Sequence, residues 1–507
     1  MILWIALAAV VVQFAVFKWF YPFASFIHGD SFVYIDIAHK NSDIESYMVG
    51  YGRFLRLFSV FTTSDTILVA FQYLFMQCSA LFLLFTLFYF YRFSKVLQMI
   101  LLCFIVLNPL FLYMGNLISS DGLFLGLSLI WFTLLLWTLH NPGTKVLLAN
   151  IAVLFFAFTV RYNALIYPLI TAVVILACRL PTRKKLASIG IGFLFCGLFM
   201  LYTGNKYKAL TGTWQYSPFG GWLMANNAMY AYRYVDSADR KPVPERFRKL
   251  DNMIRSYFDS TRDVKKFPLE AVQASTFYMW SPGLPLYAYR DTQFKKDTVS
   301  SELKKWASMG PFYKAYGMYI ISQYPLYYAR YFLWPNANKY YAPPVEFLGL
   351  YNSGYDQVTL GAKQWFDYKS TKVKTRAGSP VISVLDFYPI TSGVINVVML
   401  CGLICFAMVN GFGMSILYRK GIILAGSIWL LNAGFTIFAS SAALRFQAFP
   451  IILTTVFTLS LIDYLVKIGR QEAEEKRGTR MIGSSGTVVD NTTFHSGMIA
   501  GVGSGDK

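Results

Sequence analysis

Three apolar runs between residues 66 and 140 decide the fold. They read TILVAFQYLFMQCSALFLLFTLFYFY over 66–91, VLQMILLCFIVLNPLFLYM over 96–114 and GLFLGLSLIWFTLLLWTLH over 122–140. None of the three contains Asp, Glu, Lys or Arg. An apolar helix of about 20 residues matches the thickness of the bilayer's hydrocarbon core. The runs therefore predict three successive transmembrane helices joined by short polar turns.

The rest of the chain repeats this pattern. Of its 507 residues, 56% are hydrophobic and only 14% are charged, whereas soluble domains have about 25% charged residues. We predict a polytopic α-helical membrane protein with about ten transmembrane helices. The first predicted span, 2–20, has no basic leader and no A-x-A cleavage site, so it is expected to cross the membrane and not to be a signal peptide. The remaining predicted spans are 145–160, 164–178, 186–203, 390–417, 421–440 and 442–465.

Basic residues predict the orientation. Cytoplasmic loops are enriched in Lys and Arg, and one set of short loops is basic, whereas the opposite set holds only Arg161 and Arg445. The first set, and the N-terminus with it, is therefore expected in the cytoplasm. Its basic residues are Arg92, Lys95, Lys145, Arg179, Arg183, Lys184, Lys185, Arg419 and Lys420, followed by five more in the tail.

The same orientation predicts four parts. Residues 1–203 form an N-terminal transmembrane module whose first outer loop is 21–65, and 204–380 form one large extracytoplasmic domain, either α+β or mainly helical. Residues 201–380 contain 25 Lys and Arg against 13 Asp and Glu, which accounts for much of the net charge of +20. Residues 381–467 supply the last transmembrane helices. Residues 468–507 form a cytoplasmic tail that is expected to be disordered from about residue 483.

Several classes of function lack their motifs. All six cysteines lie in apolar runs and no CxxC pair occurs, which argues against a disulfide framework or a structural zinc site. A Walker A sequence, a Rossmann fingerprint and a G-x-S-x-G elbow in a soluble context are all absent. No basic-aromatic module stands apart from the apolar runs, so nucleic acid is not an expected partner.

The first outer loop contains a candidate catalytic residue. It reads HGDSFVYID over 28–36, and Asp30 lies about ten residues past the first span. A carboxylate near the membrane surface can act as a general base on an acceptor hydroxyl. Asp30 could instead help to bind a metal ion or cap a helix that begins there.

Three more charged residues are predicted at outer helix ends. Asp121 precedes the span 122–140, where capping by Asp121, Ser119 or Ser120 is the structural alternative. Arg161 lies in the tight outer turn between two apolar runs, and Arg445 lies at the outer entry of the last span. Arginine binds phosphate through a fork of donors, and snorkelling to headgroups is its structural alternative. In the first outer loop, Lys40, Arg53 and Arg56 are also within reach of a lipid phosphate.

The order of these motifs resembles GT-C-fold glycosyltransferases that use polyprenyl-phosphate sugars, of the protein O-mannosyltransferase and aminoarabinose-transferase type. The resemblance extends to about Asp463. It rests on Gly29-Asp30-Ser31 with Tyr34 after the first span and on Ser120-Asp121-Gly122-Leu123-Phe124 opening a later one. It also rests on Arg161-Tyr162-Asn163-Ala164-Leu165 between spans, on the large outer domain, and on Arg445-Phe446 with Pro450 in the last span.

The resemblance implies that an outer cavity receives a sugar from a polyprenyl-phosphate donor and passes it to a protein, glycan or lipid acceptor. Asp30 matches the family's catalytic acidic residue. Arg161, Arg445 and Arg53 would bind the donor phosphate, and Asp121 and Tyr34 would line the cavity. The expected location is a bacterial inner membrane with the site facing the periplasm or exterior.

Two departures from the family's pattern bear on cofactors. Many relatives have an Asp-Glu pair where Ser31 follows Asp30 here, and no D-x-D occurs. No cofactor is therefore expected, and a divalent metal, though compatible with Asp30, is not favoured.

The main alternative function is a transporter or flippase of a lipid-linked glycan, which predicts charges along the whole helical pathway. A non-catalytic membrane scaffold is the second alternative.

Overall fold

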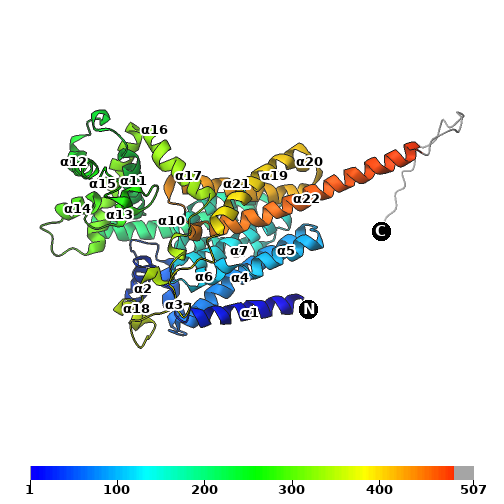
Figure 1. Ribbon diagram of the computed structural model, residues 1–507, viewed down its shortest axis with the longest axis horizontal. Coiled ribbons are helices and arrows are strands. Elements are labelled where there is room, and N and C mark those ends of the chain that lie inside the picture. Colours follow the sequence, from blue (N-terminus) through cyan, green and yellow to red (C-terminus); the bar gives the residue numbers. More distant parts are fainter. Residues whose placement is uncertain (1, 485–507) are drawn as a thin grey trace.

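The protein is a bundle of long apolar helices with a helical lobe at one end (Figure 1). The structure, a computed structural model, describes residues 2–484. Over that range it has seven helices, one of them broken, that are long and apolar enough to cross a membrane, and no named strand. A polytopic helical membrane protein is thus confirmed. The seven are α4 (Asp65–Phe90), α5 and α6 together (Lys95–Asn116), α7 (Ser120–His140), α10 (Thr182–Thr211), α19 (Tyr388–Met408), α21 (Ile416–Ala439) and α22 (Leu444–Ser484), of which Leu444–Glu474 is the candidate span.

The remaining predicted spans are shorter apolar helices. They are α1 (Ile2–Phe20), α8 (Thr144–Val160) and α9 (Tyr167–Ala177), the last preceded by a 3-10 turn over Tyr162–Ile166. Whether these three also cross the membrane stays a prediction, and so does the total of ten. The tail predicted to be disordered lies outside the described residues from position 485 onward.

Two predicted spans are broken or end early in the structure. The run 96–114 is broken into α5 (Lys95–Val106) and α6 (Pro109–Asn116), because a proline has no N–H for the helix ladder. The side chain of Asn108 caps the second piece by accepting from the N–H of Leu110 at 3.0 Å. The run 390–417 ends at Met408, so the short helix α20 (Gly411–Met414) lies in the turn before α21.

Helix α7 is the centre of the bundle. It packs against α4, α8 and α22, and most of its side chains are buried. Trp131 in its middle stacks on Tyr167 of α9 with ring centroids 3.8 Å apart, and its indole N–H donates to Thr171 at 2.9 Å. This buried helix is therefore held by neighbours from both halves of the chain.

The predicted outer segments gather at one end of the bundle, away from the C-terminal end of α22 (Figure 1). The first outer loop forms α2 (Asp30–Lys40) and α3 (Gly50–Ser59). The second segment forms a helical lobe with its own core, in which α11 (Pro218–Tyr232) packs along α15 (Glu302–Gln323). The other helices of this segment are α12 (Glu245–Ser260), α13 (Phe277–Trp280), α14 (Pro285–Gln293), α16 (Pro325–Tyr328), α17 (Trp334–Tyr341) and α18 (Leu360–Trp365).

Backbone pairing fixes the first outer loop against α7. The N–H of Ser25 donates to the carbonyl of Asn116 at 2.8 Å, and the N–H of Ile118 donates to the carbonyl of Ser25 at 3.0 Å. The amide of Gln72 on α4 donates to the carbonyls of Gly115 and Leu117. These bonds place the start of α2 beside the start of α7, although almost 90 residues separate them in the sequence.

Asn336 on α17 fixes the turn between α21 and α22. This turn is the third segment of the chain that lies near the starts of α2 and α7. The side chain of Asn336 is fully buried. Its amide nitrogen donates to the carbonyls of Thr436, Ile437 and Ser440 at 2.9, 3.0 and 2.5 Å, and its oxygen accepts from the N–H of Ala442 at 3.0 Å. One side chain thereby satisfies the backbone groups left free between two helices.

We expect Asn336→Ala to lower the free energy of unfolding by about 2–3 kcal/mol, because buried backbone groups would lose their partners. Thermal unfolding in detergent measures this effect. Asn338→Ala is the matched control, since Asn338 is on the same helix but exposed, and its expected change is within about 0.5 kcal/mol. Equal effects of the two substitutions would contradict the role of Asn336.

Candidate active site

Four of the predicted residues form one continuous chain of ion pairs at the end of the bundle that carries the helical lobe. Arg445 donates through Nη2 to Asp30 Oδ2 at 3.0 Å and through Nη1 to Asp121 Oδ2 at 3.2 Å. Arg161 pairs with the other oxygen of Asp121. The structure thus joins Asp30, Asp121, Arg161 and Arg445, which come from four separate places in the sequence.

Asp30 is the first residue of α2. The preceding Gly29 has φ +97°, a backbone conformation that side chains disfavour, and it allows the chain to turn sharply into the helix. Gly29 occupies the capping position, and the carboxylate of Asp30 makes no capping bond. Its oxygens are instead bound by Tyr47, at 2.7 Å on Oδ1, and by Arg445 on Oδ2. Capping is therefore not what holds Asp30.

Asp121, in the first turn of α7, has a side chain with no exposure to solvent. Its carboxylate also makes no capping bond; it accepts from both arginines and from the hydroxyl of Ser119 at 2.5 Å. A buried carboxylate is costly unless it is paired and hydrogen bonded. The positive end of the helix dipole adds to this stabilisation.

Arg161 lies in extended backbone directly after α8. Besides pairing with Asp121, its guanidinium lies over the ring of Phe446, 4.7 Å from the centroid. Its side chain is 18% exposed, so it faces the outside of the cluster more than Asp121 does. The arginine predicted from a tight outer turn is thus held by one carboxylate and by two aromatic rings, the second being that of Phe124 at 5.9 Å.

Arg445, in the first turn of α22, is the hub of the cluster. Its guanidinium lies between two rings, with centroids of Phe347 and Phe446 at 4.6 and 4.3 Å, which favours a planar cation. Only 6% of the residue is exposed. Its Nε is buried and has no hydrogen-bond partner among the described residues. Arg445 therefore keeps an unused N–H donor at a buried position.

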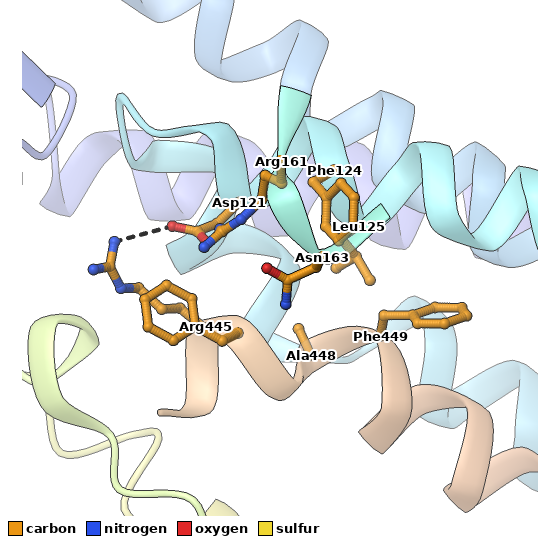
Figure 2. Close-up of a pocket in the computed structure, with 9 residues that line it drawn as sticks. Asp121, Phe124, Leu125, Arg161, Asn163, Arg445, Ala448 and Phe449 are labelled. Carbon is orange, nitrogen blue, oxygen red and sulfur yellow. Dashed lines mark hydrogen bonds and ion pairs between the residues drawn. The ribbon is translucent and has the colours of Figure 1, made fainter. Parts of the chain in front are cut away.

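A small cavity opens beside this cluster (Figure 2). Figure 2 shows Arg445 reaching from α22 towards Asp121, with Arg161 and Asn163 on the opposite wall. The cavity measures about 10 Å³, roughly the room that one water needs. Its apolar floor is formed by Phe124, Leu125, Phe446, Ala448 and Phe449. In this closed form, a ligand larger than water must displace side chains or carboxylates to reach the arginines.

The other two predicted residues are placed differently. Tyr34 lies beside the cluster, where it is buried and shares a hydrogen bond of 2.9 Å with Ser120. Arg53 donates to Asp43 at 2.7 Å and to the carbonyl of Ser42. No ion pair of the described residues connects Arg53 to the cluster. Its bonds instead anchor loop 41–49, which lies between α2 and α3.

The sequence did not reveal two residues that contact the cluster. Tyr47 comes from loop 41–49, which shows no periodic pattern, and Phe347 comes from the segment after the outer lobe. Neither position carries a local signal, because each is defined by the fold that brings it to Asp30 or Arg445. The pair of Arg445 with Phe446 was visible in the sequence, but its stacking was not.

Asp30 and Asp121 are the carboxylates of the cluster that a metal ion would need as ligands. In the part of the chain that the structure describes, no three His, Cys, Asp or Glu residues gather in a way that could hold a metal ion. Asp30 and Asp121 are both bound by Arg445. A divalent cation at these carboxylates would therefore have to replace that arginine.

Comparisons with protein-family models, with curated proteins and with solved structures found no match to this chain.

Burial predicts different roles for the two carboxylates. Asp121→Asn should lower the free energy of unfolding by about 3 kcal/mol, because it leaves two arginines without their shared buried partner. Asp30→Asn should lower the free energy of unfolding far less, since the Asp30 side chain is 24% exposed. The amide oxygen of the asparagine can also still accept from Tyr47 or Arg445. Thermal unfolding of both variants in detergent compares them. A larger loss for Asp30→Asn would reverse the assignment.

Proposed function

We propose that this protein is an integral membrane glycosyltransferase that transfers a sugar from a polyprenyl-phosphate donor to an acceptor on the extracytoplasmic side, for which a bacterial inner membrane is the proposed setting. The proposal rests chiefly on the surroundings of Arg445. A buried guanidinium stacked between two rings, with an unused Nε donor, is suited to an oxyanion such as a phosphate. The resemblance to GT-C-fold enzymes agrees with this reading.

The exposures of the carboxylates suggest how a donor enters. The charges of Asp30 and Asp121 balance those of Arg161 and Arg445, so an incoming phosphate must compete with a carboxylate. Asp121 is fully buried and pairs with both arginines. Asp30 is partly exposed and pairs with only one of these two arginines, Arg445. Asp30 is therefore the carboxylate that is proposed to yield Arg445 to the phosphate, and Asp121 keeps the arginines in place.

This exchange couples donor binding to catalysis. Once Arg445 binds the phosphate, Asp30 Oδ2 is free to accept a proton from the acceptor hydroxyl. The acceptor oxygen forms a bond to the anomeric carbon as the bond from that carbon to the phosphate oxygen breaks. The leaving polyprenyl phosphate keeps the bonding electrons and gains one negative charge. Arg161 and Arg445 stabilise that charge in a site of low dielectric.

The positions of buried charges favour this function over a flippase. Among the described residues of the seven long apolar helices, the buried charged side chains are Asp65, Asp121 and Arg445. Each lies in the first turn of its helix. A pathway that carries a charged lipid headgroup across the bilayer would be expected to have charges at its midplane.

Replacing the proposed base should abolish transfer without unfolding the protein. We expect Asp30→Asn to reduce the rate about 10²- to 10⁴-fold, the usual contribution of a general base. The measurement is transfer of labelled sugar from synthetic polyprenyl-phosphate donors to envelope extracts in proteoliposomes, with and without EDTA. Retained transfer in Asp30→Asn would exclude Asp30 as the base. Donor movement across the bilayer without sugar transfer by the unsubstituted protein would favour a flippase.

Two matched substitutions locate the donor phosphate. Arg445→Lys keeps the charge but loses the forked donor, so the donor KM is expected to rise about tenfold, or about 1.4 kcal/mol. Arg53→Lys should leave the donor KM nearly unchanged, because Arg53 is bound to Asp43. Steady-state kinetics with the same donor compares the two. An equal rise in both variants would return Arg53 to the donor site.

A further inference from the structure

Tyr47 holds the one oxygen of Asp30 that Arg445 leaves free. Its hydroxyl donates to Oδ1 at 2.7 Å, while Arg445 holds Oδ2 at 3.0 Å. Each carboxylate oxygen therefore has a partner of its own. If Arg445 turns to the donor phosphate, as proposed above, Tyr47 is the remaining side chain that fixes the orientation of Asp30.

The ring of Tyr47 is fixed on several sides. Its centroid lies 5.6 Å from that of Tyr34 on α2, 5.6 Å from that of Trp280 and 6.2 Å from that of Phe219. Phe219 and Trp280 belong to the outer lobe. Tyr47 therefore joins the proposed base to the lobe through one hydrogen bond and a set of ring contacts.

The backbone on either side of Tyr47 is also held. Tyr207 near the C-terminal end of α10 donates its hydroxyl to the carbonyl of Glu45 at 2.6 Å. Asp43 in the same loop pairs with Lys206 of α10 and with Arg53 of α3, both at 2.7 Å. A side chain on a loop braced in this way has a defined position, which positioning of a catalytic group requires.

We propose that Tyr47 is a positioning residue for Asp30: it holds Oδ1 throughout the reaction, so that Oδ2 is the oxygen that takes the acceptor's proton. The inference rests on the glycosyl transfer proposed above and goes beyond it by assigning separate tasks to the two oxygens. A hydrogen bond donated to a carboxylate favours its charged form. Tyr47 thus still donates a hydrogen bond to Asp30 after Arg445 has moved to the phosphate.

The protonation of Tyr47 suits this task. Burial raises the pKa of Tyr47 well above its usual value, and the neighbouring Asp30 carboxylate raises it further. The phenol therefore stays protonated and remains a donor at any pH at which the enzyme would work. The other ionisable groups around the pair are Tyr34, Asp121, Arg161, Arg445 and Glu346, the last of which lies near Arg445.

The pH profile of transfer separates positioning from packing. Tyr47→Phe removes one oxygen and keeps the ring between Tyr34, Phe219 and Trp280. We expect the acidic limb of kcat to move up by about one pH unit, because the carboxylate form of Asp30 loses a charged hydrogen bond. Substitution of Tyr47 by a fluorotyrosine, whose hydroxyl is a stronger donor, should move the same limb to lower pH.

Tyr51→Phe is the matched control. Tyr51 is a buried tyrosine near Tyr47 whose hydroxyl donates to Gln72 at 2.7 Å and not to Asp30. Its loss is expected to lower thermal stability and to leave the acidic limb in place. Opposite shifts for Tyr47→Phe and fluorotyrosine support the proposal. Overlapping profiles for all variants, with transfer intact, overturn it, whereas absence of transfer by the unsubstituted protein would reject the glycosyltransferase itself.

Discussion

The carboxylate of Asp121 imposes the constraint on which the charged end of the helix bundle depends. It lies in the first turn of the central helix with no exposure to solvent. A charge in that position is stable only with strong partners. Arg161 and Arg445 supply them from the turn after α8 and from the start of α22. Three apolar helices, α7, α8 and α22, are thereby held at one point.

The surrounding structure brings those partners within reach. Ser25 pairs with the backbone before α7 and so places α2 and Asp30 beside Asp121. Asn336 fixes the turn before α22 and so sets the position of Arg445. Phe347, which follows the outer lobe, covers the guanidinium. The lobe is therefore connected to the charged cluster on both sides, through Phe347 and through Tyr47.

Much of the fold could be predicted because apolar runs report directly on the bilayer. The runs 66–91 and 122–140 match α4 and α7 to within two residues. The break inside 96–114 was missed although Asn108-Pro109 marks it, because overall hydropathy outweighed the local signal. The orientation rule brought Asp30, Asp121, Arg161 and Arg445 to one side, and the structure joins them. Their pairing, and the contacts of Tyr47 and Phe347, depend on tertiary packing that a local pattern does not contain.

A cryo-EM structure of the protein with a polyprenyl phosphate bound would test the proposed mechanism directly. We expect the phosphate at Arg161 and Arg445, within hydrogen-bonding distance of Arg445 Nε or Nη atoms. We also expect Asp30 to have left Arg445 while its bond to Tyr47 remains, with Asp121 still paired to both arginines. A phosphate bound elsewhere, with the pair of Asp30 and Arg445 intact, would contradict it.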